Sequence, residues 1–178
     1  MGMQMDSGVD PADGADTAQQ PGVTAPEMGI PGAPFDPAEV AEGPAFMRAA
    51  GLVVDEVGPT RVTGHIDLGP DHHTPFGIVH GGVYSSAVET AASFGATIAV
   101  AGEGRFAVGL TNTTHFLHAV RDGRVEVEAV ALYQGRTHQL WRVSIVDTSG
   151  RLVAHGELRL QNLDAVSRPG TTSGTGSP

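Results

Sequence analysis

The sequence predicts an α+β domain in which one antiparallel β-sheet wraps around one long central helix. Small and apolar residues run almost without interruption through 82–100, a length typical of a buried helix. Two β-like segments precede this helix and four follow it, separated by turn sequences. An apolar helix of that length must be covered by a sheet on at least one side, which gives the predicted architecture.

The β-like segments alternate between apolar and other residues with a period of two. We expect strands at 52–57, 61–68, 106–117, 124–134, 138–147 and 152–162. Gly58-Pro59, Gly135-Arg136 and Ser149-Gly150 are typical turn sequences between neighbouring strands. The consecutive strands after the helix are therefore expected to pair antiparallel through short turns.

Composition divides the chain into one domain and two tails. Residues 1–34 are rich in Pro and Gly, and residues 164–178 are rich in Ser, Thr and Gly. We predict that both are flexible tails and that the folded domain spans residues 35–163.

A short helix is expected just before the first strand. Asp36 followed by Pro37 is typical of a helix N-terminus. Gly43-Pro44 is expected to interrupt this helix, which resumes through residues 47–50. Residues 72–79 are expected to form the loop that leads into the long helix.

Charge and cysteine content exclude several classes of function. Lys and Arg number 10 and Asp and Glu number 20, so a formal net charge of -10 disfavours nucleic acid and anionic membrane as partners. No long apolar run indicates a transmembrane helix, and the acidic N-terminus does not resemble a secretory signal. The absence of cysteine excludes disulfides and thiolate metal sites and fits a reducing cytoplasm.

His80-Gly81-Gly82 lies where the loop becomes the long helix. The first N–H groups of a helix have no internal partners, and the helix dipole is positive there. Gly81 and Gly82 can therefore offer N–H groups to a carbonyl oxygen that becomes negative during a reaction, as an oxyanion hole requires. The alternative is a glycine-rich helix start that serves only a tight turn.

Glu89 is the only charged side chain in the predicted helix. A buried carboxylate without a partner is costly, so it either faces water or has a task. With Ser85, Ser86 and Ser93 it forms a narrow polar stripe. Glu89 is suited to act as a nucleophile or as a general base on water, and Ser93 to hold that water or orient the carboxylate. The alternative is a solvent-exposed stripe.

The spacing of these features favours a dimer. Gly81 and Glu89 are about 12 Å apart along one helix, which is far for two groups that act on one carbonyl. Two antiparallel copies across a dimer axis would bring Gly81 of one chain to Glu89 of the other.

The helix segment G-I-V-H-G-G-V-x-x-S-x-x-E-x-x-A-S resembles the active-site helix of hotdog-fold thioesterases of the phenylacetate-degradation (PaaI-like) type. The likeness extends over 51–160 and includes T-N-x-x-x-F-L from Thr111, G-R-T from Gly135 and G-R-L-V-A-H-G from Gly150. It is strongest to the branch with the Arthrobacter-type 4-hydroxybenzoyl-CoA thioesterases, which carry Glu at the position of Glu89 where many relatives carry Asp.

The resemblance implies a hotdog dimer, often paired into a homotetramer, that hydrolyses acyl-CoA thioesters. It implies that Glu89 is the catalytic carboxylate, that Gly81 supplies the oxyanion N–H and that Ser93 assists the carboxylate or its water. No metal or redox cofactor is required, and coenzyme A enters as part of the substrate. The acyl group is expected to be aromatic or a medium-chain fatty acyl group.

Two further groups of candidates follow from the resemblance. Relatives commonly place Asn or Gln in the loop before the glycines, whereas this chain has His72, His73 and Thr74, so His73 or Thr74 is the candidate donor to the thioester carbonyl. Arg136 and Thr137 match a segment that contacts CoA phosphates. His118, Arg121 and Arg124 are near in sequence and are further candidates that could join them.

Other functions are less well supported. His65, His115, His138 and His155 have no metal-ligand spacing, and no G-x-S-x-G elbow is present. A non-catalytic acyl-CoA-binding or sensor domain on the same fold is the first alternative, although it would not need Glu89 or Ser93. An enoyl-CoA hydratase is the second, although the Asp/His pair on which such enzymes usually rely is not found.

Overall fold

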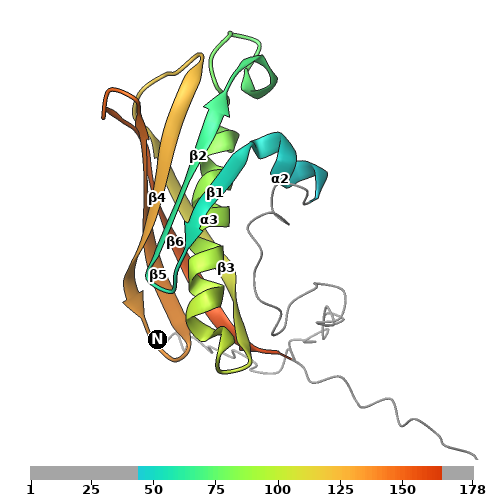
Figure 1. The fold of residues 1–178 in the computed structure, drawn as a ribbon, viewed down its shortest axis with the longest axis vertical. Coiled ribbons are helices and arrows are strands. Elements are labelled where there is room, and N and C mark those ends of the chain that lie inside the picture. The colour runs from blue at the N-terminus through green and yellow to red at the C-terminus, as the bar shows by residue number, and fades with distance from the viewer. Residues whose placement is uncertain (1–43, 166–178) are drawn as a thin grey trace, which may run out of the picture.

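The computed structural model describes residues 44–165, in which a six-stranded sheet curves around one long helix (Figure 1). The elements are α2 (Ala45–Ala50), β1 (Leu52–Val57), β2 (Arg61–Leu68), η2 (Pro70–His72), α3 (Gly81–Ala101), β3 (Arg105–Phe116), β4 (Gly123–Gln134), β5 (His138–Asp147) and β6 (Leu152–Asp164). The predicted α+β class is confirmed, and the expected strands and the long helix are present with ends that differ by two residues at most.

Some expectations fall outside the described residues. These are the tail at 1–34 and the helix start at Asp36-Pro37. The tail expected at 164–178 begins at the last residue of β6, and its residues from 166 on are also outside the description.

The strand order is β1-β2-β4-β5-β6-β3, and all neighbouring strands are antiparallel. Pairing between strands adjacent in sequence holds for β4, β5 and β6, but the expectation is wrong for β3, which pairs with β6 at the sheet edge. Helix α3 packs closely on β3, so the chain enters the sheet at that edge. Residues 117–122 then return to β4 across three strand spacings, about 14 Å, which a connection of about 20 Å when extended covers.

Small residues let the sheet approach α3 closely. A Cβ atom at Gly95 would collide with the ring of Trp141, which is fully buried on β5. A Cβ atom at Gly156 on β6 would lie 2.7 Å from a methyl group of Val88. The buried face of the helix is formed by Tyr84, Ala87, Val88, Ala91, Ala92, Gly95, Ala96 and Val100. This packing holds α3 at a fixed height above the sheet, so groups along the helix keep fixed positions relative to β3.

Among residues 44–165, the only neighbour of β3 is β6, so these residues leave one long edge of the sheet unpaired. Large apolar side chains near this edge are exposed: Leu110 at 52%, Phe116 at 56% and Leu117 at 48%. A long exposed edge with apolar side chains is a template for pairing with another strand.

Candidate active site

The start of α3 is capped by His80. Its Nδ1 atom accepts a hydrogen bond of 2.8 Å from the N–H of Gly82, and its carbonyl accepts one from Val83. Within residues 44–165, the N–H of Gly81 has no hydrogen-bond partner. Of the two glycines considered as oxyanion donors, Gly82 is therefore already bonded and Gly81 is open.

Glu89 lies half-buried on the side of α3 that faces β3. The Nδ2 atom of Asn112 donates 3.1 Å to Oε2 of Glu89 and 3.0 Å to the carbonyl of Ser85. The hydroxyl of Thr114 donates 2.7 Å to Oδ1 of Asn112, which fixes the amide with its NH₂ group toward the carboxylate. Among the described residues Glu89 forms no salt bridge, so a neutral amide and not a cation holds it.

Gly109 makes room for the carboxylate. A Cβ atom at this position would collide with Oε1 of Glu89. The register between β3 and β6 shifts between Gly109 and Thr111, so the strand is irregular where the carboxylate packs against it. Local sequence patterns did not indicate the roles of Gly109, Asn112 and Thr114. A glycine inside a strand is the signal that would have indicated a close approach here.

The serine stripe divides into separate parts. Ser86 donates 2.7 Å to the carbonyl of Gly82 one turn back. In the part of the chain that the structure describes, no hydrogen bond joins Ser93 to Glu89. Asn112 therefore binds the carboxylate that Ser93 was expected to orient, and the other expected role of Ser93, to hold the attacking water, stays a prediction.

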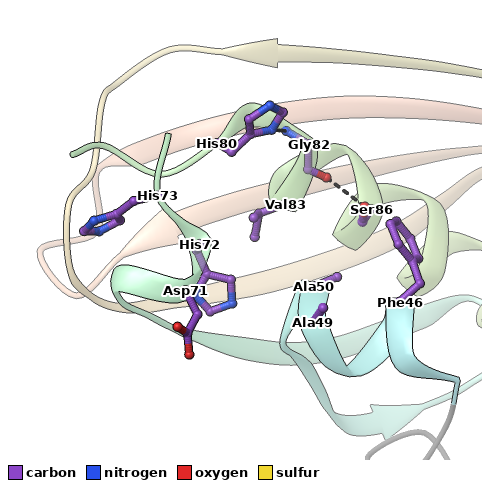
Figure 2. A pocket seen from close by; sticks show the side chains of 10 residues that line it. All are labelled: Phe46, Ala49, Ala50, Asp71, His72, His73, His80, Gly82, Val83 and Ser86. Carbon is purple, nitrogen blue, oxygen red and sulfur yellow. Dashed lines mark hydrogen bonds between the residues drawn. The ribbon is translucent and has the colours of Figure 1, made fainter. Parts of the chain in front are cut away.

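A pocket of about 400 Å³ lies between α2, η2 and the start of α3 (Figure 2). Figure 2 shows Phe46, Ala49 and Ala50 of α2 facing the first turns of α3, with the His80 ring over Gly82. The lining residues are Phe46, Ala49, Ala50, Asp71, His72, His73, His80, Gly82, Val83 and Ser86. Glu89 is not among them, so in one chain the carboxylate and the pocket are separate.

In the loop before α3, the polar side chains that were expected to face a substrate form hydrogen bonds to the backbone instead. The Nε2 atom of His73 donates 2.7 Å to the carbonyl of Arg121. The hydroxyl of Thr74 donates 3.1 Å to the carbonyl of Ile78 and accepts 3.3 Å from the N–H of Phe76. Both side chains thus hold the loop in shape, which leaves Gly81 as the open donor beside it.

Tyr84 places a hydroxyl group in the interior. It is 3% exposed, and among the described residues its hydroxyl makes no hydrogen bond. Burial raises the pKa of Tyr84 to about 12. Its ring lies 6.3 Å from that of Phe116, and Phe116 in turn covers Gly81, where an added Cβ would lie 2.8 Å from the ring.

Comparison with known proteins identifies the family. Residues 76–154 match the family model described as the thioesterase superfamily. The chain is 39% identical over 134 residues to a Mycobacterium tuberculosis protein named "Putative esterase Rv1847", an alignment that covers 74% of this chain and 96% of the relative. The solved structure of that relative superposes with a TM-score of 0.66 at 39% identity and covers 68% of this chain and 98% of its own. The chain belongs to the thioesterase superfamily.

Two further relatives agree with this assignment. The 1,4-dihydroxy-2-naphthoyl-CoA hydrolase of Escherichia coli is 33% identical over 84 residues, which is 47% of this chain and 61% of that protein. The thioesterase HI1161 of Haemophilus influenzae shares the fold, with a TM-score of 0.68 at 23% identity over 77% of this chain and 96% of its own. The chain is a thioester hydrolase with the expected hotdog fold.

The CoA-binding candidates of this thioesterase lie at opposite ends of α3. His118 donates 2.8 Å to the carbonyl of Leu152, and Arg121 bonds through its carbonyl to His73, near the helix start. The carbonyl of Arg136 instead accepts a hydrogen bond from Arg105, the first residue of β3, which follows the C-terminal end of α3. A helix of 21 residues separates these ends by about 30 Å. The expectation that His118 and Arg121 join Arg136 and Thr137 is therefore wrong within one chain.

Arg124 has a partner of its own. Its Nε and Nη2 atoms each lie 2.8 Å from an oxygen of Asp67 in a two-pronged ion pair. This hydrogen bonding holds the pKa of Asp67 below its usual value. Arg124 of this thioesterase is thus bound to the sheet surface and is a poor candidate for phosphate.

Neither a metal site nor a membrane span is found in the described part of this thioesterase. No three His, Cys, Asp or Glu side chains among residues 44–165 are grouped as a metal ion requires. Over the same residues, no helix combines the length and the apolar character needed to cross a membrane.

Proposed function

We propose that the chain is an acyl-CoA thioesterase that releases a free acid and CoA, with Glu89 as the catalytic carboxylate and the Gly81 N–H as the oxyanion donor. One observation carries the proposal. A half-buried carboxylate, held by the neutral amide of Asn112, lies on the same helix whose first N–H group has no partner among the described residues. A base or nucleophile and an oxyanion donor are the two groups that acyl transfer requires.

The contacts of Glu89 suit either of two roles. Asn112 binds Oε2, and Oε1 lies in the space that Gly109 leaves beside β3. An ionised carboxylate in this position attacks the thioester carbonyl to form a mixed anhydride, or it takes a proton from an attacking water. In both routes the thiolate of CoA leaves and the N–H of Gly81 stabilises the carbonyl oxygen as it becomes negative. In the first route water then hydrolyses the anhydride, which releases the free acid and restores the carboxylate of Glu89.

We further propose that the active site forms between two chains. Gly81 and Glu89 are about 12 Å apart along α3, and the pocket beside Gly82 does not include Glu89. The exposed β3 edge carries Leu110 and Phe116. Antiparallel pairing of two such edges would continue the sheet and set two copies of α3 side by side, with Gly81 of each near Glu89 of the other. Two such dimers would form the homotetramer.

The same dimer would bring the separated CoA candidates together. The helix-end residues Arg136 and Thr137 of one chain would approach the helix-start residues His118 and Arg121 of the other. We propose that Arg136 and Thr137 bind the phosphates of CoA, because a guanidinium matches phosphate geometry. CoA belongs to the substrate, and the proposed reaction needs no other cofactor.

The acyl group is proposed to be aromatic or medium-chain. The pocket of about 400 Å³ has an apolar wall formed by Ala49, Ala50 and Val83, next to the ring of Phe46. This volume accommodates one or two aromatic rings or a medium-length alkyl chain. The name of the Escherichia coli relative, a hydrolase of an aromatic CoA thioester, supports the aromatic choice. The reaction also fits the cytoplasmic location expected from the cysteine-free composition.

Release of CoA thiol from benzoyl-, phenylacetyl- and fatty acyl-CoA thioesters tests the proposal. The protein has no cysteine, so a thiol reagent reports only the product. Wild type should turn over at least one thioester, and Glu89→Ala should lose about a hundredfold or more in kcat. Glu126→Ala, which removes an exposed carboxylate on β4, is the matched control and should keep wild-type activity.

Other outcomes would assign other functions. Binding of acyl-CoA without release of thiol would support a sensor domain. Loss of enoyl absorbance without thiol release would support a hydratase. Equal activity of Glu89→Ala and wild type would remove Glu89 from the mechanism. Sedimentation at several protein concentrations tests the dimer, and a fully active monomer would contradict the shared site.

A further inference from the structure

We infer that Asn162, Gln139 and Arg105 are positioning residues that hold the turn at 135–137 in the shape that receives the phosphate-bearing part of CoA. The inference rests on the proposed function, since it concerns how that same substrate is recognised. The turn carries Arg136 and Thr137. The sequence alone indicated no role for Asn162, Gln139 or Arg105.

A buried amide network ends at this turn. Gln139 is 0% exposed and Asn162 is 5% exposed. The Nε2 atom of Gln139 donates 2.9 Å to the carbonyl of Ala96 in α3 and 2.8 Å to Oδ1 of Asn162. Its Oε1 atom accepts from Trp141 at 3.0 Å and from Gln134 at 3.1 Å. Every hydrogen-bonding site of this amide is thus used.

The network has only one consistent orientation. The carbonyl of Ala96 can only accept, so the atom of Gln139 that faces it must be the NH₂ nitrogen. The facing atom of Asn162 must then be its oxygen, which directs its Nδ2 atom toward the turn. The Ala96 carbonyl of α3 therefore fixes the orientation of both buried amides, and Asn162 donates to the turn.

All three carbonyls of the turn accept hydrogen bonds from β6 or from Arg105. Asn162 donates from Nδ2 to Gly135 at 2.9 Å and to Arg136 at 3.3 Å, and its N–H donates 2.9 Å to Thr137. The Nη1 atom of Arg105 adds a bond of 2.7 Å to the carbonyl of Arg136. The backbone of the turn is thereby fixed on its acceptor side.

The donor side of the turn is open. Among residues 44–165, the N–H groups of Arg136 and Thr137 have no hydrogen-bond partner, and the exposed guanidinium of Arg136 forms no ion pair. Open N–H groups and a free guanidinium on one rigid turn are suited to phosphate oxygens. Arg105 is itself held by Asp164 at 2.9 Å and is largely covered, so it supports the turn and is not the anion ligand.

The test compares two thioesters of the same acyl group, one on CoA and one on pantetheine, which lacks the nucleotide and its phosphates. Asn162→Ala in the full chain should raise KM for the CoA thioester about five- to tenfold. Its kcat, and both constants for the pantetheine thioester, should stay within about twofold of wild type. Gln161→Ala, the exposed neighbour on the same strand, is the control and should change neither substrate.

A double-mutant cycle shows whether Asn162 acts through Arg136. Arg136→Ala should raise KM for the CoA thioester, and Asn162→Ala should then add less than about twofold, because its target is gone. Equal losses on both thioesters, or full additivity in the cycle, would overturn the inference and leave Asn162 a general stabilising residue.

A second variant guards against loss of folding. If Asn162→Ala does not fold, Arg105→Gln removes the other donor to the Arg136 carbonyl and must show the same KM effect confined to the CoA thioester. If wild type hydrolyses neither thioester, the proposed function fails, and calorimetric binding of CoA and of pantetheine decides the inference instead. Weakened binding of CoA alone would support it, and equal weakening of both would overturn it.

Discussion

The polar groups at the two ends of α3 differ in their hydrogen bonding. At the N-terminal end, the N–H of Gly81 and the buried hydroxyl of Tyr84 have no hydrogen-bond partner among the described residues. At the C-terminal end, Gln139 uses every hydrogen-bonding site of its amide, and Asn162 passes the network on to the next turn. Both ends are packed on the same sheet, so burial alone does not explain the difference.

The buried amides of Gln139 and Asn162 belong to the framework, whereas groups without a partner among the described residues, including two N–H groups of the turn at 135–137, are available to a ligand. A buried polar group without a partner costs about 1–3 kcal/mol, so a folded chain satisfies such groups wherever shape is the only requirement. Open groups beside a pocket are expected where a ligand supplies the missing partner. Glu89 is intermediate between these two kinds of group, because Asn112 donates a hydrogen bond to its Oε2 atom while its Oε1 atom lies beside Gly109.

The largest expected effect comes from breaking the neutral contact of Glu89. Asn112→Asp would place a second carboxylate where the amide now donates 3.1 Å to Glu89. Two adjacent carboxylates resist joint ionisation, so one proton stays bound to a higher pH. We expect kcat at pH 7 to fall about a hundredfold, because less Glu89 is ionised and because Glu89 also loses the amide donor that orients it. The acid limb of the pH–rate profile should move upward.

Thr113→Asp is the matched control for this change. It adds the same charge at the next residue of β3, which is exposed and pairs with Glu157. Its pH–rate profile should follow that of wild type. An unchanged acid limb in Asn112→Asp would mean that ionised Glu89 does not limit the reaction.

The second prediction compares the same change, glycine to alanine, at the two ends of the helix. In Gly81→Ala the new Cβ would lie 2.8 Å from the Phe116 ring and would displace the helix start. In Gly102→Ala the new Cβ meets no atom within 4 Å. We expect kcat/KM to fall about tenfold in the first variant, as for a weakened oxyanion donor, and to stay unchanged in the second.

The ring of Phe116 is expected to account for this loss. In a Phe116→Ala background, Gly81→Ala should lower kcat/KM by less than about twofold relative to Phe116→Ala alone, because the collision is then absent. If Gly102→Ala lowers activity as much as Gly81→Ala, the two ends do not differ in function and the assignment of Gly81 fails.

The sequence predicted the framework well because its signals are local. Period-two alternation located the strands, and the run of small residues located α3 within one residue at each end. The position of β3 could not be found in this way. Short turns favour pairing between neighbours in sequence, whereas β3 is placed by its packing on α3 and by a connection long enough to recross the sheet.

The site was predicted in part, and its untested roles stay predictions. Glu89 and Gly81 stand out locally, as a lone charge and as a glycine at a helix start. Asn112 could not be found from spacing, because it reaches Glu89 across 23 positions of sequence through the fold. The bond between His80 and Gly82 was also missed, since histidine is not a common N-cap residue.

The smallest expected effect tests whether the hydroxyl of Tyr84 is in fact unpartnered. Loss of a hydroxyl without a hydrogen bond removes no favourable contact, so Tyr84→Phe should leave the free energy of unfolding at pH 7 within about 1 kcal/mol of wild type, or raise it. Denaturant unfolding of the two proteins measures this difference. A loss of more than that amount would mean that the hydroxyl has a partner and that the N-terminal end is as closed as the other.

The pH dependence of stability provides a second comparison of wild type with Tyr84→Phe. The folded pKa of Tyr84 is about 12, against an ordinary value of 10.0, so the fold favours the protonated phenol. Above pH 10 the unfolded chain loses this proton more readily than the folded one, and stability falls until the pH reaches the folded value. Wild type should therefore lose up to about 3 kcal/mol more stability than Tyr84→Phe between pH 10 and 12. Parallel curves for the two proteins over this range would show that the phenol is already in contact with water.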